Sequence, residues 1–499
     1  MGLGLVGGVS RGRLGLVLSL GAALAIPSVA QAQIIPDSTL DAEASRVLPQ
    51  AVVDGLETTI IEGGAARGQN LFHSFADFNI DAGQRVYFAN PAGIEAILSR
   101  VTGGNPSNIF GTLGVDGPAS LFLINPNGIV FGENASLDIQ GSFYASTAEA
   151  IALGDGVYSA TEPEQSSLLT VNPSALFSTY LSDASGDIQN RGQLTAQGNL
   201  TLAANNLDLQ GQVAAGGNLM LLGLDTVQIR DTADTPFVGF AGGDLLVQGN
   251  ERVDIVALGH RDSGLYSYGD MVLRSGNPVA GDAHYWSGGS FRVETLNEAL
   301  GQLFSPIDPI IRALGDVNIE GYRGSSLHVL AGGSVTIGTA YIYYLADSGV
   351  PGIDFLQETL VLTDGTVISI DGGAQPTLDI RAGISPNIIS IPVENITGLD
   401  LDFDRFLDQS LQLTQPSFFD LPSTADISIG DAWIDAPNGL VLLSNQYEPN
   451  VELSRGDILV TGEGFWGDGI YVSRFGEQSG AVFIDSRGDM GCDLSRETL

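Results

Sequence analysis

Carboxylates are the side chains with which this chain is best equipped to do chemistry, because it has 58 aspartates and glutamates. Carboxylates aligned on one face of a stack of strands can bind Ca²⁺ or act as acid and base on polysaccharides. Asp244 and Asp270 each follow a glycine in the same context, so they are expected to stack, with a cation between them or with both pointing into solvent. With so many acids, chance spacing is the better explanation, and no metal or catalytic site is predicted. The candidates are Asp225, Asp231, Asp244, Asp254 and Asp270.

Histidines are the second set of candidate residues. They show no metal-ligand spacing among themselves. His73 is interpreted as packed or hydrogen-bonded. The segment Asp282-Ala-His284-Tyr-Trp286 is the most enzyme-like cluster, and we interpret it as a bulky corner of a structural repeat. The four histidines are His73, His260, His284 and His328.

Other catalytic signatures are missing from the sequence. After the predicted signal peptide it contains no Gly-x-Ser-x-Gly nucleophile motif, and it has no Gly/Asp-rich calcium nonapeptide. The phosphate-binding Gly-Lys motif is impossible because the chain has no lysine. We therefore predict a protein that is not an enzyme and takes no cofactor.

Composition indicates a β-rich repeat protein. The 499 residues include 66 glycines but only 21 prolines, which favours frequent tight turns over disorder. The formal net charge is −38, so we expect no binding to nucleic acid or anionic lipid. Cys492 is the only cysteine, so no internal disulfide can form.

The N-terminal segment Met1–Ala32 is predicted to be a signal peptide for the general Sec export machinery. Arg11 and Arg13 precede an apolar run over Leu14–Leu24, and Ala30-Gln31-Ala32 supplies small residues for cleavage before Gln33. An uncleaved anchor is the alternative, but the apolar run is shorter than the ~20 residues a membrane span needs.

A recurring unit follows, in which glycine and a small polar residue precede alternating apolar positions. Such alternation predicts strands with one buried face, and their recurrence predicts the coils of a β-solenoid. The fold class is therefore all-β, a right-handed parallel β-helix. Successive units begin at Gly198, Gly217, Gly243, Gly269, Gly289, Gly315 and Gly333.

After the signal peptide, the chain divides into segments that differ in composition and in strand pattern. Residues 33–180 form an N-terminal domain, and residues 181–383 form the shaft of repeats. Residues 384–426 are poor in glycine and read as an insertion, in which Asp400–Phe419 could be helical. Strand patterns resume over residues 427–499, where no clear polar cap follows, so we expect these coils to be a truncated part of a longer protein.

The sharpest local motif is the turn Asn125-Pro126-Asn127-Gly128. It separates the apolar runs Leu121–Ile124 and Ile129–Phe131. Pro126 presets one backbone angle, and Asn127 and Gly128 tolerate those that follow, so the turn fixes the register of both strands. On physical grounds a purely structural turn and a functional motif are equally good explanations.

The N-terminal third, about Gln33–Phe177, resembles the secretion domain of the filamentous haemagglutinin family, the exported partners of two-partner secretion systems. The Asn125–Gly128 turn maps onto that family's Asn-Pro-Asn-Gly motif. The family's second Asn-Pro element is commonly Asn-Pro-Asn-Leu, whereas this chain has Asn90-Pro91-Ala92-Gly93. The resemblance also rests on the segments Arg67–Phe75, Val86–Ile94, Ser99–Gly104, Asn105–Leu113 and Ile129–Gly132.

The resemblance implies a function and a route of export. The chain would cross the periplasm of a Gram-negative-type envelope, and a dedicated outer-membrane β-barrel transporter would recognise its N-terminal domain. Folding outside the cell, coil upon coil, would bias its movement outward. Adhesion to cell-surface or carbohydrate ligands is the implied role of the secreted or surface-bound product.

Two other functions remain open from the sequence. A secreted β-helical lyase or hydrolase would need an acidic groove with ordered aspartates and a cation. A toxin delivery stalk would need a distinct C-terminal effector domain, and the C-terminal part of the chain still reads as shaft.

Overall fold

The structure is a computed structural model that describes residues 33–168, 170, 186–343, 352–389, 424–462, 469–472 and 480–492. The predicted signal peptide and the helix expected over Asp400–Phe419 lie outside these residues. The chain separates into two units, Met1–Gln31 and Ala32–Leu499, and all described residues belong to the second. In this described part, no helix has the length and apolar character needed to cross a membrane.

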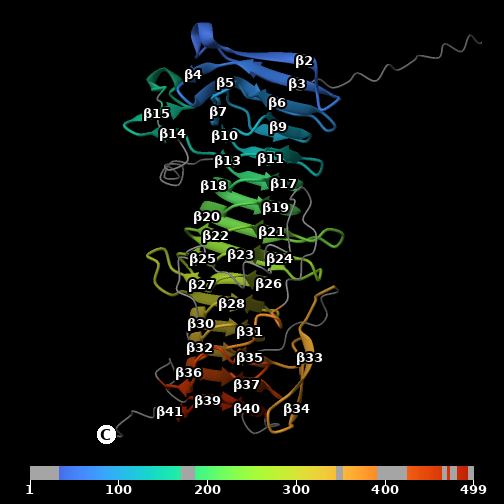
Figure 1. The fold of residues 1–499 in the computed structure, drawn as a ribbon, viewed down its shortest axis with the longest axis vertical. Helices are drawn as coiled ribbons and strands as arrows, with labels where there is room; N and C mark the ends of the chain where they lie inside the picture. The colour runs from blue at the N-terminus through green and yellow to red at the C-terminus, as the bar shows by residue number, and fades with distance from the viewer. Residues whose placement is uncertain are drawn as a thin grey trace, which may run out of the picture. The chain divides into compact units, whose positions relative to one another are not determined.

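The described chain is almost entirely β-structure, as predicted (Figure 1). Its helical elements are two short 3₁₀ turns, η1 (Asp41–Glu43) and η2 (Pro163–Gln165). One sheet system contains 37 strands, and two separate hairpins contain two strands each. Apart from the pairs made by β1 to β4 at the N-terminal end, the strands of the large system pair in parallel with the coil before and the coil after. This is the parallel β-helix expected from the sequence.

The strand bounds fall into four groups along the coil stack. The N-terminal end contains β1 (Ile34–Pro36), β2 (Ser45–Val53), β3 (Leu56–Gly63) and β4 (Ala65–Arg67). The first coils contain β5 (Asn70–Phe78), β6 (Arg85–Ala89), β7 (Ala96–Val101), β8 (Ser107–Ile109), β9 (Thr112–Asp116), β10 (Ser120–Ile124), β11 (Ile129–Phe131), β12 (Ser136–Asp138) and β13 (Phe143–Ser146). The middle coils contain β16 (Ile188–Asn190), β17 (Gln193–Ala196), β18 (Leu200–Leu209), β19 (Gln212–Ala215), β20 (Leu219–Arg230), β21 (Val238–Ala241), β22 (Leu245–Gly249), β23 (Arg252–Ala257), β24 (Gly264–Ser267), β25 (Met271–Ser275), β26 (Val279–Ser287), β27 (Phe291–Glu294), β28 (Gln302–Ser305), β29 (Ile310–Ala313), β30 (Val317–Gly324), β31 (Leu327–Ala331) and β32 (Val335–Ile342). The last coils contain β35 (Thr377–Arg381), β36 (Ile427–Ile434), β37 (Leu440–Ser444), β38 (Ile458–Val460), β39 (Ile470–Val472), β40 (Ala481–Asp485) and β41 (Met490–Cys492).

The repeat spacing read from the sequence is the coil length of the structure. Each of the seven glycine units contributes one apolar residue, two positions after its glycine, to a single column of paired strands. Leu200 pairs with Leu219, and Leu219 pairs with Leu245. The seven predicted repeats therefore lie one above another. The column continues through Met271, Phe291, Val317 and Val335.

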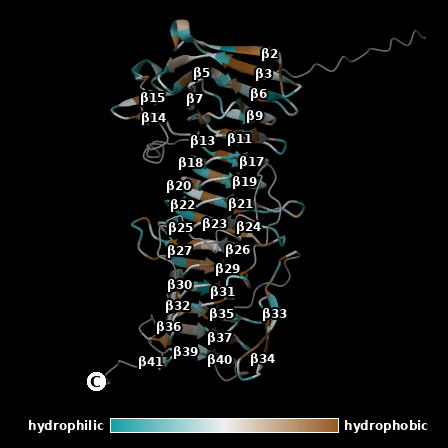
Figure 2. Ribbon diagram, in the orientation of Figure 1, coloured by the Kyte–Doolittle hydropathy of each residue, from teal (hydrophilic) through white to brown (hydrophobic). Residues whose placement is uncertain are grey.

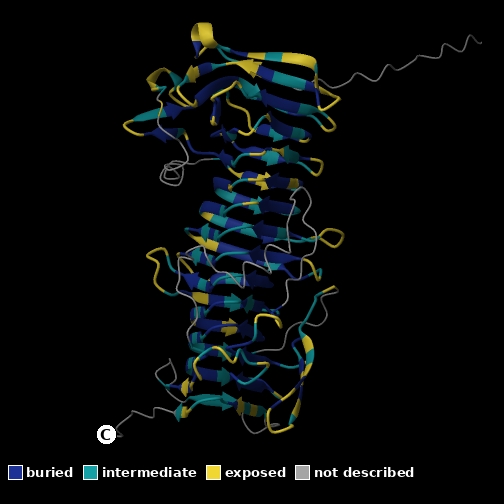
Figure 3. Cartoon of the chain, viewed as in Figure 1, coloured by how far each residue is buried: buried dark blue, intermediate teal, exposed yellow. Residues whose placement is uncertain are grey.

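The core is the lumen enclosed by the coils. Inward side chains alternate with outward ones, so that polar and apolar residues mix along each strand in Figure 2 while the coils are mostly buried in Figure 3. One continuous hydrophobic cluster runs from Ile34 to Val460. Each aliphatic side chain that is fully buried there stabilises the stack by about 1.5–3 kcal/mol.

The N-terminal end of the stack is closed by antiparallel strands. β2 and β3 form a hairpin, and only β3 continues in parallel, onto β6. β1 and β4 both pair antiparallel with β5. Exposed residues concentrate on this hairpin in Figure 3, since its outer surface faces solvent rather than another coil.

A ladder of hydrogen bonds at one corner explains the glycine–polar repeat. The side-chain oxygen of each polar residue accepts the backbone N–H of the equivalent residue one coil later, at 2.7–3.1 Å. A Cβ on Gly243 or Gly269 would lie about 2.1–2.2 Å from such an oxygen, so these two positions require glycine. In this ladder the acceptor side chain always lies on the earlier coil. The rungs are Ser120, Ser142, Asn199, Asn218, Asp244, Asp270, Ser290, Asp316, Ser334, Asp426, Asp457 and Asp489.

Two hairpins cover the outside of the coils. β14 (Ala150–Leu153) and β15 (Gly156–Ser159) pack on the outer face of the first coils, against a cluster that includes Phe72, Leu98 and Phe122. β33 (Gln357–Val361) and β34 (Val367–Asp371) lie beside the last coils. This second hairpin falls inside the segment 181–383, which we predicted as continuous shaft, and the sequence analysis did not anticipate it. Most of the predicted insertion, residues 390–423, lies outside the described residues.

Candidate functional site

The predicted secretion motif is a turn wedged between three coils. It connects β10 to β11, and the N–H of Gly128 donates to the carbonyl of Asn125 at 3.1 Å. Gly128 has a φ of +118°, and a Cβ there would lie 3.1 Å from the carbonyl oxygen of Asp187 in the next coil. The turn therefore depends on glycine at this position, as the sequence suggested.

Asn125 is buried, and both the nitrogen and the oxygen of its carboxamide make hydrogen bonds. Its Nδ2 donates to the carbonyl of Asn105 and to Oγ of Ser107, both at 3.0 Å. Its Oδ1 accepts the N–H of Asn127 at 3.0 Å. Because Asn105 and Ser107 belong to the preceding coil, Asn125 joins two coils through hydrogen bonds that no apolar residue could replace.

Asn127 is the exposed member of the motif, and its bond is peripheral. Its Nδ2 donates to the carbonyl of Gly103 at 2.7 Å. Gly103 lies in the segment Ser99–Gly104, one of the segments on which the family resemblance rests. The adjoining segments Ser99–Gly104 and Asn105–Leu113 thus meet the Asn125–Gly128 turn at one corner.

The second Asn-Pro turn is shallower. The N–H of Ile94 donates to the carbonyl of Pro91 at 3.1 Å, and Pro91 is exposed. With its amide oriented to suit its neighbours, Asn90 accepts the N–H of Ala119 at 3.0 Å and donates to the carbonyls of Pro91 and Ile94. This turn also links two coils. Asn90 makes one hydrogen bond to the neighbouring coil, whereas Asn125 makes two.

A buried arginine organises the space behind these turns. Arg100 Nε donates to Oγ of Ser74 at 2.9 Å, and Nη2 donates to Oγ1 of Thr39 at 2.8 Å. Nη1 donates to the carbonyl of Ser159 at 2.7 Å and to Oγ of Ser166 at 2.6 Å. Arg100 therefore connects the N-terminal segment, the first coil and the β14–β15 hairpin.

Asp37 and Tyr158 complete this buried network. Asp37 accepts hydroxyl groups of Ser74 and Thr102 at 2.7 and 2.6 Å, and these bonds hold the pKa of its carboxyl below the ordinary value even though burial opposes them. The Arg100 guanidinium lies 4.3 Å from the ring centre of Tyr158. Burial lowers the pKa of Arg100, and the neighbouring Asp37 and Tyr158 oppose that shift. We call Asp37, Arg100 and Tyr158 the N-terminal network.

His73 lies in the same region and is neutral. Its ring packs near Phe75 and Phe88, and its Nδ1 lies 3.0 Å from Oγ of Ser45. Burial lowers the pKa of His73 to about 3. Tyr158 donates its hydroxyl to the His73 carbonyl at 2.7 Å, so this histidine is packed and hydrogen-bonded.

The cluster Asp282–Trp286 does not form a catalytic pair. Asp282, His284 and Trp286 point away from the lumen on β26, where Asp282 accepts the N–H groups of Ile307 and Asp308 at 3.0 and 3.1 Å and the hydroxyl of Ser305. Burial raises the pKa of Asp282 to about 7. His284 instead lies 3.3 Å from Asp354, which comes from another segment.

The five candidate acids are dispersed over separate contacts. Asp244 and Asp270 lie one above the other, and Oδ1 of Asp244 accepts the N–H of Asp270 at 2.9 Å, a contact that was not foreseen from the sequence. Asp254 pairs with Arg230 and Arg252. Asp231 accepts the N–H of Gly259 at 2.7 Å, and Asp225 is exposed. Within the described ranges, no group of three or more histidine, cysteine or acidic side chains could hold a metal ion.

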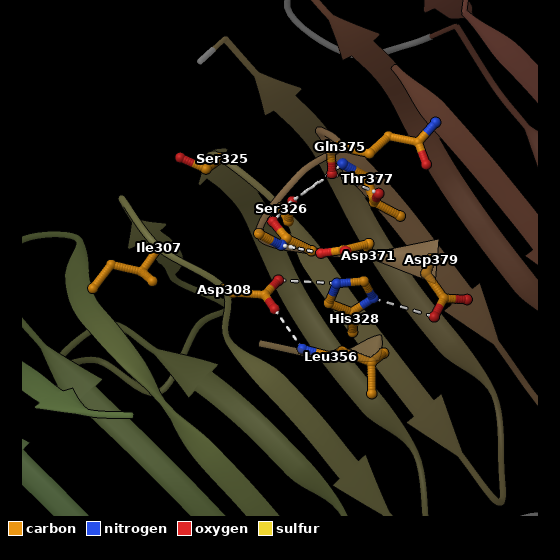
Figure 4. Close-up of polar contacts among 12 residues, drawn as sticks. Ile307, Asp308, Ser325, Ser326, His328, Leu356, Asp371, Gln375, Thr377 and Asp379 are labelled. Atoms are coloured by element: carbon orange, nitrogen blue, oxygen red, sulfur yellow. Dashed lines mark hydrogen bonds and ion pairs between the residues drawn. The ribbon is translucent and has the colours of Figure 1, made fainter. Parts of the chain in front are cut away.

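The sequence analysis missed a second buried network, centred on His328 (Figure 4). His328 lies between Asp308 at 2.9 Å and Asp379 at 3.2 Å, and all three are fully buried. Asp379 also pairs with Arg381 at 2.7 Å. Although burial opposes it, the two carboxylates raise the pKa of His328 to about 9, so the imidazole is positively charged at neutral pH. A signal existed in the sequence: Asp379 and Arg381 share one face of an otherwise apolar strand.

The N-terminal part of the chain is similar to known secretion domains. The family described as the TPS secretion domain matches residues 32–293. Among solved structures, the HMW1 secretion domain from Haemophilus influenzae is 15% identical, with a TM-score of 0.33, over 90% of this chain and 100% of that one. The filamentous hemagglutinin secretion domain is 16% identical, with a TM-score of 0.29, over 62% of this chain and 96% of that one. No curated protein sequence matches the chain.

The matched residues are more than half of the chain, and they contain the closed end, both Asn-Pro turns and the N-terminal network. The chain belongs to the TPS secretion domain family. It is thus an exoprotein of two-partner secretion, and the resemblance stated from the sequence is confirmed.

Proposed function

We propose that the N-terminal coils direct this exoprotein through a dedicated outer-membrane β-barrel transporter, after Sec-dependent passage through the periplasm. The match of the secretion-domain family to residues 32–293 is the observation that carries the proposal. The mature chain would begin at Gln33, whose carbonyl accepts the N–H of Asn79 at 3.1 Å. Ala30 and Ala32 of the proposed cleavage site lie outside the described residues.

The direction of the corner ladder supports folding from the N-terminal end. Each earlier coil presents an oxygen that the N–H of the following coil needs, for instance Asn218 for Asp244 and Asp270 for Ser290. A coil that leaves the transporter therefore meets a preformed edge and a preformed acceptor on the coil before it. A repeat array that grows by nearest-neighbour contacts in this way would hinder return of the chain.

For the exported product we propose an adhesive or surface-interaction role, with a protein or carbohydrate ligand, on the secreted or surface-retained protein. The proposal assigns no catalytic function. In support, Asp244 and Asp270 bind backbone groups, and Asp282 accepts backbone N–H groups rather than facing a histidine. For the motif itself, we propose that Asn125, Pro126, Asn127 and Gly128 act in secretion by building the corner, as do Asn90 and Pro91.

Replacing Asn127 by alanine tests the secretion proposal. The bond to Gly103 would be lost while the buried Asn125 is kept, and we expect reduced export, with precursor retained in the periplasm. Immunoblots of culture medium and periplasmic extract, from cells that also produce the cognate barrel, measure this distribution. Asn134→Ala is the matched control, because Asn134 is exposed and its side chain makes no hydrogen bond with the described residues. Equal secretion of both variants and the unaltered chain would show that the motif is dispensable.

A further inference from the structure

One segment of the chain runs across the coils instead of along them. We call residues 352–376 the strap. Its start is tied at Asp354, whose N–H donates to the carbonyl of Leu258 at 2.8 Å. Further on, the N–H of Leu356 donates to Asp308 at 2.9 Å, and Thr363 at the hairpin tip donates its hydroxyl to Asp485 at 2.6 Å.

These contacts span a large part of the coil stack. Leu258 precedes β24, and Asp485 ends β40. Between them, one face of the helix consists of seven strands paired in succession: β24, β26, β29, β31, β35, β37 and β40. Six spacings of about 4.8 Å make about 29 Å, and the stretch from Asp354 to Thr363 reaches about 30 Å when extended. The strap is therefore a nearly straight tie along the outside of these coils, as β33 indicates in Figure 1.

The underside of the strap is apolar and is matched to the coils. Leu360, Ile368 and Ile370 are buried in one cluster with Leu440 and Leu442 of β37. On its outer side, by contrast, Val361 is 62% exposed and Val367 is 64% exposed. The alternation of β33 and β34 thus fixes which face packs on the coils.

The half-buried Glu358 and the buried charges beneath it hold the middle of the strap. Glu358 on β33 pairs with Arg381 at 2.7 Å and accepts the hydroxyl of Tyr447 at 3.0 Å. Arg381 continues to Asp379 and from there to His328 and Asp308. Asp308 in turn accepts the N–H of Leu356 in the strap, as Figure 4 shows. The charged groups around His328 therefore come from three places: Asp308 before β29, Asp379 and Arg381 on β35, and Glu358 on the strap, with Asp282 bonded to the Asp308 N–H.

Chain order decides when this tie can form. Tyr447 comes 89 positions after Glu358, and Asp485 comes 122 positions after Thr363. The strap cannot dock fully before β37 and β40 have formed, however early its own residues become available. Once docked, it opposes separation of the last coils, because peeling one coil away would also break the contacts of its neighbours.

We propose that the strap docks last, that it controls the opening of the coils from β35 to β41, and that His328, between Asp308 and Asp379, holds it in place. This inference does not depend on the export route. It assigns a stabilising function to a hairpin that contributes no strand to the coils themselves.

Hydrogen exchange measured by mass spectrometry on the mature chain tests the proposal. Thr363→Ala removes the hydroxyl bond at the tip and leaves only the 3.3 Å bond from the backbone N–H of residue 363 to Asp485, and we expect about fivefold faster exchange in peptides covering residues 352–376 and 440–485. Thr359→Ala on the same hairpin is the matched control, because Thr359 is exposed and donates no side-chain hydrogen bond within the described residues. Exchange in residues 45–146 should be unchanged in both variants.

A second variant tests the charge. His328→Gln keeps a polar group between Asp308 and Asp379 without the positive charge, and the strap and the last coils should become sensitive to protease while the first coils stay protected. Should this variant not fold, Thr363→Ala still decides the matter. The proposal is overturned if Thr363→Ala and Thr359→Ala exchange alike, or if the strap stays fully protected in folded His328→Gln.

Discussion

The two ends of the coil stack each bury a histidine, and they use it in opposite ways. His73, near the closed N-terminal end, lies among Phe75, Phe88 and the hydroxyl of Ser45, and its low pKa keeps it neutral. His328, under the strap, lies between two carboxylates, and its raised pKa keeps it charged. Burial by itself lowers the pKa of both, so the neighbouring charges decide the difference.

The comparison shows how the same fold is secured by different means. At the N-terminal end an antiparallel hairpin covers the edge of the stack, and Arg100 ties the segment before that hairpin, at Thr39, to the first coil and to β15. Toward the other end, a strap crosses the coils from outside, and a chain of buried charges fastens it. The first arrangement can form as soon as the chain is present up to Ser166, the last partner of Arg100 in sequence. The second has to wait for Asp485, near the end of the described chain.

Replacing Arg100 should cause the largest loss of stability, and the loss should be confined to the N-terminal end of the stack. Arg100→Met removes the hydrogen bonds of a fully buried guanidinium and leaves the half-buried Asp37 without its neighbouring positive charge, and we expect a loss of roughly 3–5 kcal/mol. Urea unfolding of the mature chain measures the loss, and hydrogen exchange locates it in residues 33–168. Arg46→Met is the control, because Arg46 is exposed on the outer hairpin. An equal loss in both variants would mean that the N-terminal network does not secure this end.

A change of pH should have a smaller effect on stability, and it should destabilise one end in acid and the other end in alkali. Unfolded histidine has a pKa of about 6.5. The folded pKa of His73 is about 3, so its contribution to stability is lost as the pH falls from 6.5 toward 3. The folded pKa of His328 is about 9, so its contribution is complete below pH 6.5 and is lost as the pH rises toward 9.

Hydrogen exchange at pH 5, 6.5 and 8.5, corrected for the intrinsic pH dependence of exchange, measures this separation. We expect residues 45–88 to lose protection first in acid and residues 352–381 to lose it first in alkali. His73→Phe should remove the acid effect alone, and His328→Gln should remove the alkaline effect alone. Loss of protection at the same end on both sides of pH 6.5 would contradict the assigned charge states.

The sequence predicted the coils well because their signal is local. Glycine, a small polar residue and alternating apolar positions recur at the intervals that the structure shows as coil lengths, from Leu200 to Val335. The Asn125–Gly128 turn was also found, since its conformation needs a proline and a glycine close together in sequence. The cause of the glycine in each repeat was not found, because the oxygen that crowds it belongs to another coil.

The buried networks could not be predicted in the same way. Arg100 appeared in the segment Ser99–Gly104, but its partners Thr39, Ser159 and Ser166 are about 60 positions away along the chain. The strap carries strand-like alternation, so its sequence resembles the shaft that it covers. Only the register of the coils brings Thr363 to Asp485, and nothing in the local pattern of either residue indicates that contact.

The order in which the two ends form is the central claim, and pulse-labelling hydrogen exchange during refolding of the mature chain from urea measures it most directly. We predict that amides in β5 to β13 become protected first, that protection spreads through the ladder toward β32, and that residues 352–376 become protected last. Protection of the strap before the first coils, or of both at the same time, would contradict growth from the closed end.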